Sequence, residues 1–223
     1  MVTATETWKA AHPGAAVGWL IINKVTNPKT CPDLDRRREA LEAELRASFP
    51  DRAAIKALPT IQAYTRYYKR FKKTYHVQSQ VESVALKARN IPRVAALVEA
   101  MFMAELKSQL LTAGHDLAAV EPPLTVDSAQ GGETYMGLSG RELSLKAGDM
   151  FMADVKGPIS SVIYGPDRRT SIGPGTSRAM FVVYGPPGIG RPAIESHLDL
   201  IVANVRLISP QAEVESKQVA EAP

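Results

Sequence analysis

The sequence is poor in cysteine and contains no long apolar run. Among 223 residues Cys31 is the only cysteine, which excludes an internal disulfide and suits a reducing compartment. It precedes Pro32 with no histidine nearby, so we expect an incidental thiol and not a nucleophile or a metal ligand. No segment approaches the roughly 20 apolar residues that span a bilayer, and the amino-terminal residues do not follow a signal-peptide pattern. We therefore expect a soluble, cytoplasmic protein with no membrane partner.

Motifs for metals, cofactors and nucleophilic catalysis are also missing. The segment 181–190 imitates the strand and glycine loop of a nucleotide hydrolase. However, Arg191 and Pro192 stand where that chemistry needs a lysine and a magnesium-binding hydroxyl. The four histidines show no metal-ligand spacing, and no Gly-x-Ser-x-Gly elbow is present. We expect the glycine loop to be a turn, and we expect neither a metal nor a cofactor.

Positive charge is concentrated in one segment, residues 64–75. The chain has 27 basic and 23 acidic residues, and the whole basic excess lies in this segment, which contains no acid. Cations interleaved with aromatic rings suit an RNA strand, because the cations meet phosphates and the rings stack on bases. The alternative is an amphipathic helix that buries its aromatic face and solvates its basic face. The candidate RNA-binding residues are Arg66, Lys69, Arg70, Lys72 and Lys73.

The expected elements separate helices from strands along the chain. After a buried strand at Val17–Val25, a helical portion over about 33–113 precedes a strand-rich portion over about 124–190. A closing helix over about 191–206 follows, and the polar residues 209–223 suggest a flexible tail. The apolar spacing from Arg93 onward predicts a helix that Gly114 ends. This order predicts one α+β domain over residues 1–208.

Several short motifs follow one another in a familiar order. They are Ile91-Pro92, Gly114-His115-Asp116, Ala129–Glu133, Gly137–Gly140, Leu145–Asp154, Ser161–Gly165 and Arg169–Thr176. In this order they resemble the editing domain of the phenylalanyl-tRNA synthetase β subunit and its stand-alone relatives, and the resemblance covers roughly residues 60 to 190. The resemblance implies a three-layer sandwich of two sheets with flanking helices.

The resemblance also implies a pocket for an amino acid esterified to the end of a tRNA. A site that polarises a water near the ester carbonyl is sufficient for hydrolysis, and no covalent nucleophile is needed. The candidate catalytic residues are Glu133, His115 and Asp154, and the candidate pocket residues are Tyr164, Gly165 and Thr176. The alternative for Glu133 is a turn carboxylate that accepts backbone N–H groups. Asp154 has a similar alternative as a turn residue at the end of a strand.

The chain departs from the editing pattern at three places. Editing sites of the synthetases carry a histidine three residues before the corner aspartate, where this chain has Ala113. They carry a glutamate six residues beyond the late threonine, where this chain has Val182. An asparagine of the preceding helix is also missing, around Phe102-Met103. The acid–base groups of the family are therefore not retained in place.

Three functions remain open on the sequence. The first is a trans-acting deacylase that hydrolyses misacylated tRNA, with tRNA or aminoacyl-tRNA as its partner. The second is a non-catalytic module that binds tRNA or another structured RNA, which the missing acid–base residues favour. The third is a pocket protein that binds a free amino acid. No feature of the sequence indicates an oligomeric state.

Overall fold

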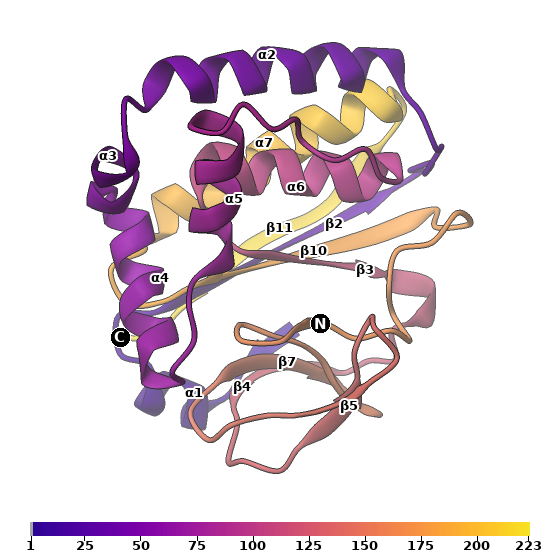
Figure 1. Ribbon diagram of the computed structural model, residues 1–223. Coiled ribbons are helices and arrows are strands. Elements are labelled where there is room, and N and C mark those ends of the chain that lie inside the picture. The colour runs from indigo at the N-terminus through magenta and orange to yellow at the C-terminus, as the bar shows by residue number, and fades with distance from the viewer. Residues whose placement is uncertain (1) are drawn as a thin grey trace.

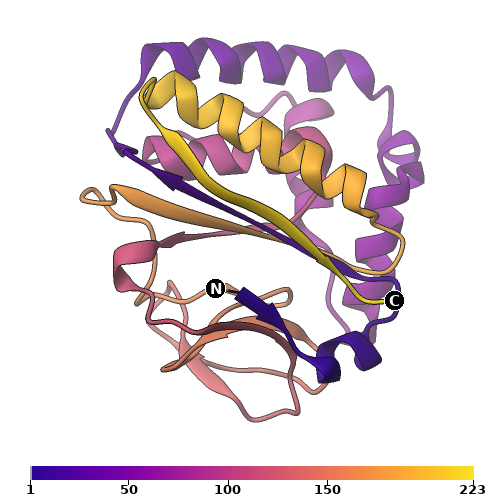
Figure 2. The same ribbon diagram turned by 180° about the vertical axis from the view of Figure 1, so that it is seen from behind.

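A computed structural model describes residues 2–223 as three stacked layers. Helices cover one face of a four-stranded sheet, and a five-stranded sheet faces its other side (Figures 1 and 2). This confirms the expected α+β class with two sheets and flanking helices. Within residues 2–223, no helix combines the length and the apolar character needed to cross a bilayer.

The four-stranded sheet combines strands from the beginning, the middle and the end of the chain. Its order is β11-β2-β10-β3, and every neighbouring pair is antiparallel. The expected flexible tail over 209–223 is wrong for most of its length, because β11 pairs with β2 along the whole of β2. Because one face of this edge strand is exposed to solvent, its residues are largely polar, and the sequence therefore did not indicate a strand here. The strands are β2 (Ala16–Asn23), β3 (Thr112–Asp116), β10 (Arg178–Gly185) and β11 (Glu213–Glu221).

The five-stranded sheet has the order β1-β4-β7-β8-β9. A parallel pairing attaches β1 to β4, and the remaining neighbours are antiparallel. A separate hairpin, β5–β6, carries a small apolar cluster of its own. The short helix α1 (Glu6–Ala11) connects β1 of this sheet to β2 of the four-stranded sheet. The strands are β1 (Val2–Ala4), β4 (Leu124–Ser128), β5 (Thr134–Met136), β6 (Glu142–Ser144), β7 (Met150–Asp154), β8 (Gly157–Ser161) and β9 (Gly165–Pro166).

The helical layer is built on α6 and α7, which pack directly against the four-stranded sheet, with α2 outside them. The expected helix end at Gly114 is wrong: α6 ends at Ser108, and Gln109 takes a left-handed conformation with φ 58°. Gly114 lies inside β3, where an added Cβ would come within 2.8 Å of Ile172. The helices are α2 (Pro32–Ser48), α3 (Arg52–Ala57), α4 (Pro59–Arg70), α5 (His76–Ala85), α6 (Ala96–Ser108) and α7 (Arg191–Ile208), with a 3-10 turn η1 (Leu117–Ala119).

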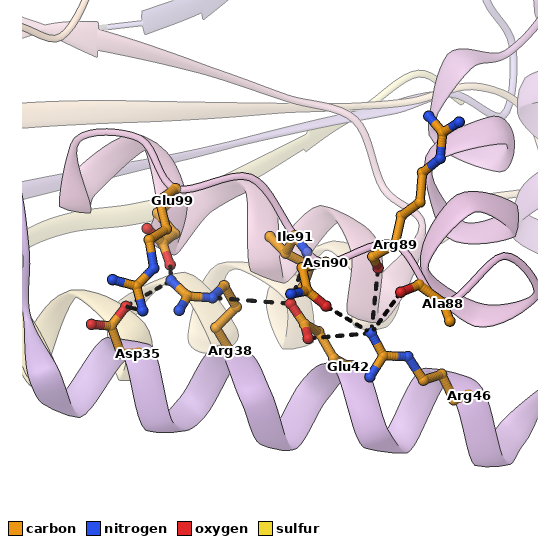
Figure 3. A network of polar contacts seen from close by, with 10 residues as sticks. Asp35, Arg38, Glu42, Arg46, Ala88, Arg89, Asn90, Ile91 and Glu99 are labelled. Atoms are coloured by element: carbon orange, nitrogen blue, oxygen red, sulfur yellow. Dashed lines mark hydrogen bonds and ion pairs between the residues drawn. The ribbon is translucent and has the colours of Figure 1, made fainter.

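A buried ion network fixes α2 to its neighbours (Figure 3). Arg38 donates to Glu99 of α6 at 2.6 Å and to Asp35 at 2.7 Å, although only 4% of Arg38 is exposed. Glu42, one helical turn further on, accepts the backbone N–H of Ile91 at 2.7 Å. Because each buried charge has a partner of opposite sign or a hydrogen bond, the network holds α2, α6 and the segment before α6 in one arrangement.

Candidate nucleic-acid interface and the neighbouring polar sites

The aromatic residues of the 64–75 segment belong to the core. Tyr64, Tyr67, Tyr68, Phe71 and Tyr75 are each at most 6% exposed. The segment covers the last two turns of α4 and the turn after it, so rings three and four residues apart fall on one face. This burial leaves none of the five rings free to stack on a nucleic-acid base.

The hydroxyl groups of these tyrosines bond to distant parts of the chain. Tyr64 donates to the carbonyl of Tyr184 and accepts the N–H of Leu111 at 3.0 Å, which ties α4 to both β10 and the start of β3. Tyr68 donates to the carbonyl of Val162 at 2.7 Å, and Tyr75 donates to that of Gln109 at 2.8 Å. The inner face of α4 is therefore held rigidly against both sheets.

The cations of the segment lie on the opposite, solvent-facing side. Arg66, Lys69, Arg70, Lys72 and Lys73 are all exposed. Within residues 2–223, none of the five forms an ion pair. The Arg70 guanidinium lies 5.4 Å from the centre of the Tyr67 ring, and the Lys73 ammonium lies 5.5 Å from that of Tyr164. These contacts orient two of the cations and leave their charge unneutralised.

A sixth cation joins this surface through the fold. Lys56, at the end of α3, lines a groove of about 390 Å³ together with Arg66 and Lys69. Ile61 and the polar residues Gln62, Thr65 and Gln78 complete the groove. Sequence reasoning missed Lys56, because a single lysine in an alanine-rich stretch carries no signal of its own. We call Lys56, Arg66, Lys69, Arg70, Lys72 and Lys73 the basic surface.

His115 lies fully buried between the two sheets. Its Nδ1 is 2.7 Å from the hydroxyl of Thr170, and its Nε2 is 3.1 Å from that of Ser160 on β8. The Ser160 hydroxyl in turn lies 2.7 Å from that of Tyr184 on β10. Burial lowers the pKa of His115 to about 3. The imidazole is therefore neutral, and its hydrogen bonds link one sheet to the other.

The carboxylates of Glu133 and Asp154 are engaged in turns. Glu133 accepts the backbone N–H groups of Gln130 at 2.7 Å and of Gly131 at 2.9 Å. Asp154 accepts two hydrogen bonds from Arg169, at 2.8 and 2.9 Å. Burial would raise the pKa of Asp154, but the hydrogen bonds from Arg169 and from two backbone N–H groups hold it below its usual range. Among residues 2–223, no hydrogen bond or ion pair connects Glu133, Asp154 and His115 to one another.

The three candidate pocket residues take different environments. Tyr164 is half-buried beneath the Lys73 ammonium. The carbonyl of Gly165 accepts the Tyr135 hydroxyl at 2.7 Å. Thr176 is buried and donates to Asp116, the neighbour of His115, at 2.8 Å. The structure thus brings Thr176 close to the end of β3, whereas Tyr164 belongs with the β5–β6 hairpin.

Two of the three positions that depart from the editing pattern lie side by side. Ala113 of β3 is the cross-strand partner of Val182 of β10, and both are at most 3% exposed. They face the five-stranded sheet, since His115 and Tyr184, two residues further along each strand, reach Ser160 on that side. Two apolar side chains therefore fill this part of the space between the sheets.

Comparison with known proteins agrees with this architecture. A family model described as the B3/4 domain matches residues 62–196. The structure is similar to an N-terminal fragment of the phenylalanyl-tRNA synthetase β subunit from Pyrococcus horikoshii, with a TM-score of 0.50 and 11% identity. That match covers 98% of this chain and 50% of the other, so the chain spans about half the length of that fragment. No curated protein sequence matches. Because the family model covers more than half of its residues, the chain belongs to the B3/4 domain family, found in the phenylalanyl-tRNA synthetase β subunit.

Proposed function

We propose that this domain binds tRNA or another structured RNA through its basic surface and does not hydrolyse an ester bond. The observation that carries the proposal is the set of exposed, unpaired cations on α4, on the turn after it and at the end of α3, where buried tyrosines hold α4 in place. A surface whose positive charge has no acidic partner attracts phosphates and gains entropy when counterions leave them. The similarity to a tRNA synthetase fragment makes tRNA the first partner to test.

The burial of the rings decides which kind of RNA contact to expect. Single-strand binding proteins stack bases on exposed aromatic side chains. Here Tyr67, Tyr68 and Phe71 are buried, so the basic surface offers cations without stacking platforms. Such a surface contacts the phosphates of a folded or helical RNA and carries no base specificity. We therefore expect binding to stems, with a strong dependence on salt.

Three features favour binding over hydrolysis. The positions where the editing pattern has its histidine and glutamate hold Ala113 and Val182, and both are buried. A general base needs a pKa near the working pH, whereas His115 has a pKa of about 3. The Glu133 carboxylate already accepts hydrogen bonds from two backbone N–H groups.

The experiment measures the affinity for a bulk tRNA pool, for an RNA hairpin and for an unpaired RNA of the same length, over a series of salt concentrations. One variant replaces Arg66, Lys69, Arg70, Lys72 and Lys73 with alanine. The matched control replaces with alanine five exposed cations elsewhere, none of which forms an ion pair within residues 2–223. These are Lys29, Arg37, Lys87, Arg89 and Arg206.

The first variant should bind tRNA far more weakly. The slope of its log binding constant against log salt concentration should become less negative by about 0.9 for each phosphate that it no longer neutralises. The control variant should keep both properties. An equal weakening in the two variants would reject the basic surface as the binding surface. In parallel, the unaltered protein is incubated with a panel of mischarged tRNAs. Release of an amino acid faster than in buffer would contradict the non-catalytic part of the proposal.

A further inference from the structure

The groove in the basic surface takes part of its floor from a third helix. α3 packs against both α4 and α5 (Figure 1). Lys56 of α3 and Arg66 and Lys69 of α4 supply the cations of the groove, whereas Gln78 comes from α5. These cations are exposed, but only 8% of Gln78 is, so Gln78 lies at the bottom of the groove.

A neighbouring carboxylate fixes the orientation of the Gln78 amide group. The Gln78 Nε2 donates to Glu82 at 2.7 Å, and Arg52 donates to the same oxygen at 2.8 Å. Burial would raise the pKa of Glu82, but the hydrogen bonds from Gln78 and Arg52 hold it below its usual range. Because an ionised carboxylate only accepts hydrogen bonds, Gln78 must turn its NH₂ group toward Glu82 and its oxygen away.

The Gln78 oxygen is therefore an acceptor that the protein leaves free. Within residues 2–223 it accepts no hydrogen bond, and it is not one of the enclosed polar side-chain atoms that lack a partner. It is thus open to the groove that Gln78 lines. A phosphate has no donor for this oxygen, whereas a hydroxyl group beside a phosphate does. The groove therefore combines cations for phosphates with one acceptor for a neighbouring hydroxyl.

We propose that this groove takes the ribose–phosphate backbone of an RNA stem, and that the Gln78 oxygen accepts a hydrogen bond from a ribose 2′-hydroxyl. Lys56, Arg66 and Lys69 pair with the adjacent phosphates. Since DNA lacks the 2′-hydroxyl, this contact distinguishes RNA from DNA without reading a base. The inference rests on RNA binding by the basic surface and adds to it a residue that selects the sugar.

The test compares an RNA hairpin with the same hairpin carrying 2′-fluoro groups throughout its stem, by fluorescence anisotropy at one salt concentration. Fluorine keeps the A-form shape and the phosphate charge but has no proton to donate. The unaltered chain should bind the RNA hairpin about fivefold more tightly, which is the effect of one hydrogen bond. Gln78→Met removes the acceptor and should bind both hairpins about as tightly as the unaltered chain binds the fluorinated one. Loss of the fold would instead weaken both below that affinity.

Gln80→Met is the matched control, because Gln80 lies on the same helix and does not line the groove. It should keep the preference for the RNA hairpin. Equal binding of the two hairpins by the unaltered chain, a comparison that needs no variant, would overturn this inference and leave RNA binding intact. A preference that persists in a folded Gln78→Met protein would overturn it as well. Failure to bind either hairpin would overturn RNA binding by the basic surface, and this inference with it.

Discussion

Ala113 and Val182 are directly opposed across β3 and β10 and point together into the space between the sheets. The resemblance to synthetase editing domains assigns a histidine to the first position and a glutamate to the second. Cross-strand partners have Cβ atoms about 5 Å apart, a separation suited to two groups that act on one water. This chain keeps the juxtaposition and fills it with two apolar side chains, so the departure concerns a pair of neighbours and not two unrelated sites.

Introducing the glutamate alone should destabilise the protein. Val182→Glu places a carboxylate at a position that is 0% exposed. We expect the free energy of unfolding to fall by about 3 kcal/mol or more, measured by urea denaturation. Val155→Glu changes a valine that is 60% exposed and should cost about 0.5 kcal/mol or less. Equal costs would show that the space between the sheets is hydrated.

The hydroxyl of Tyr64 should contribute to stability and not to RNA binding. Tyr64→Phe leaves the Leu111 N–H without its 3.0 Å acceptor in the core, which costs about 1–3 kcal/mol of unfolding free energy. Tyr164→Phe, at a half-buried tyrosine near the surface, serves as the control and should cost less. Chemical denaturation measures both. Weaker tRNA binding by a folded Tyr64→Phe protein would contradict the assignment of this ring to the core.

Arg38 should matter far more than its neighbour Arg36. Arg38→Met leaves the Glu99 carboxylate, which is only 4% exposed, without its cation. We expect the unfolding free energy to fall by about 3–5 kcal/mol. Arg36→Met, on the same helix, removes an exposed pair with Asp33 and should cost about 1 kcal/mol or less. Comparable costs would mean that the network shown in Figure 3 contributes no more than a surface pair.

Glu105 should make stability fall as the pH rises. Burial raises the pKa of Glu105 to about 8, although the hydrogen bond that its carboxylate accepts from the Thr112 N–H acts to lower the pKa. Between about pH 4.5 and 8 the folded state keeps a proton that the unfolded state has released. This group therefore lowers the unfolding free energy by up to about 1.4 kcal/mol per pH unit in that window. Glu105→Gln should flatten the profile measured from about pH 5 to 8, and an unchanged slope would contradict the raised pKa.

Removal of β11 should impair folding, whereas removal of Pro223 alone should not. Truncation after residue 209 leaves the whole edge of β2 without a partner and uncovers Trp19. An unpaired hydrophobic edge strand favours self-association. We expect a lower unfolding midpoint and aggregation by light scattering. A truncated chain with the midpoint of the full chain would show that residues 210–223 are the tail that their composition suggests.

The fold class followed from the sequence because its signals are local. The buried strand expected at Val17–Val25 is β2, and the closing helix expected over about 191–206 is α7, both at bounds close to those observed. The family followed from the order of short motifs between residues 60 and 190. β11 and the end of α6 did not follow, because an edge strand and a helix end depend on which neighbours arrive to pair with them.

The sequence by itself determined that a basic, aromatic segment exists and that the acid–base pattern of editing sites is absent. Only the tertiary structure decided the separate roles of the rings and the cations in this segment. Packing buried the rings of Tyr64 and Tyr68 and left cations such as Lys69 exposed to solvent. It also placed Lys56 beside them and opposed Ala113 to Val182. The physical reason is that burial and charge proximity depend on contacts between residues far apart in the chain, whereas charge and periodicity are properties of neighbours in sequence.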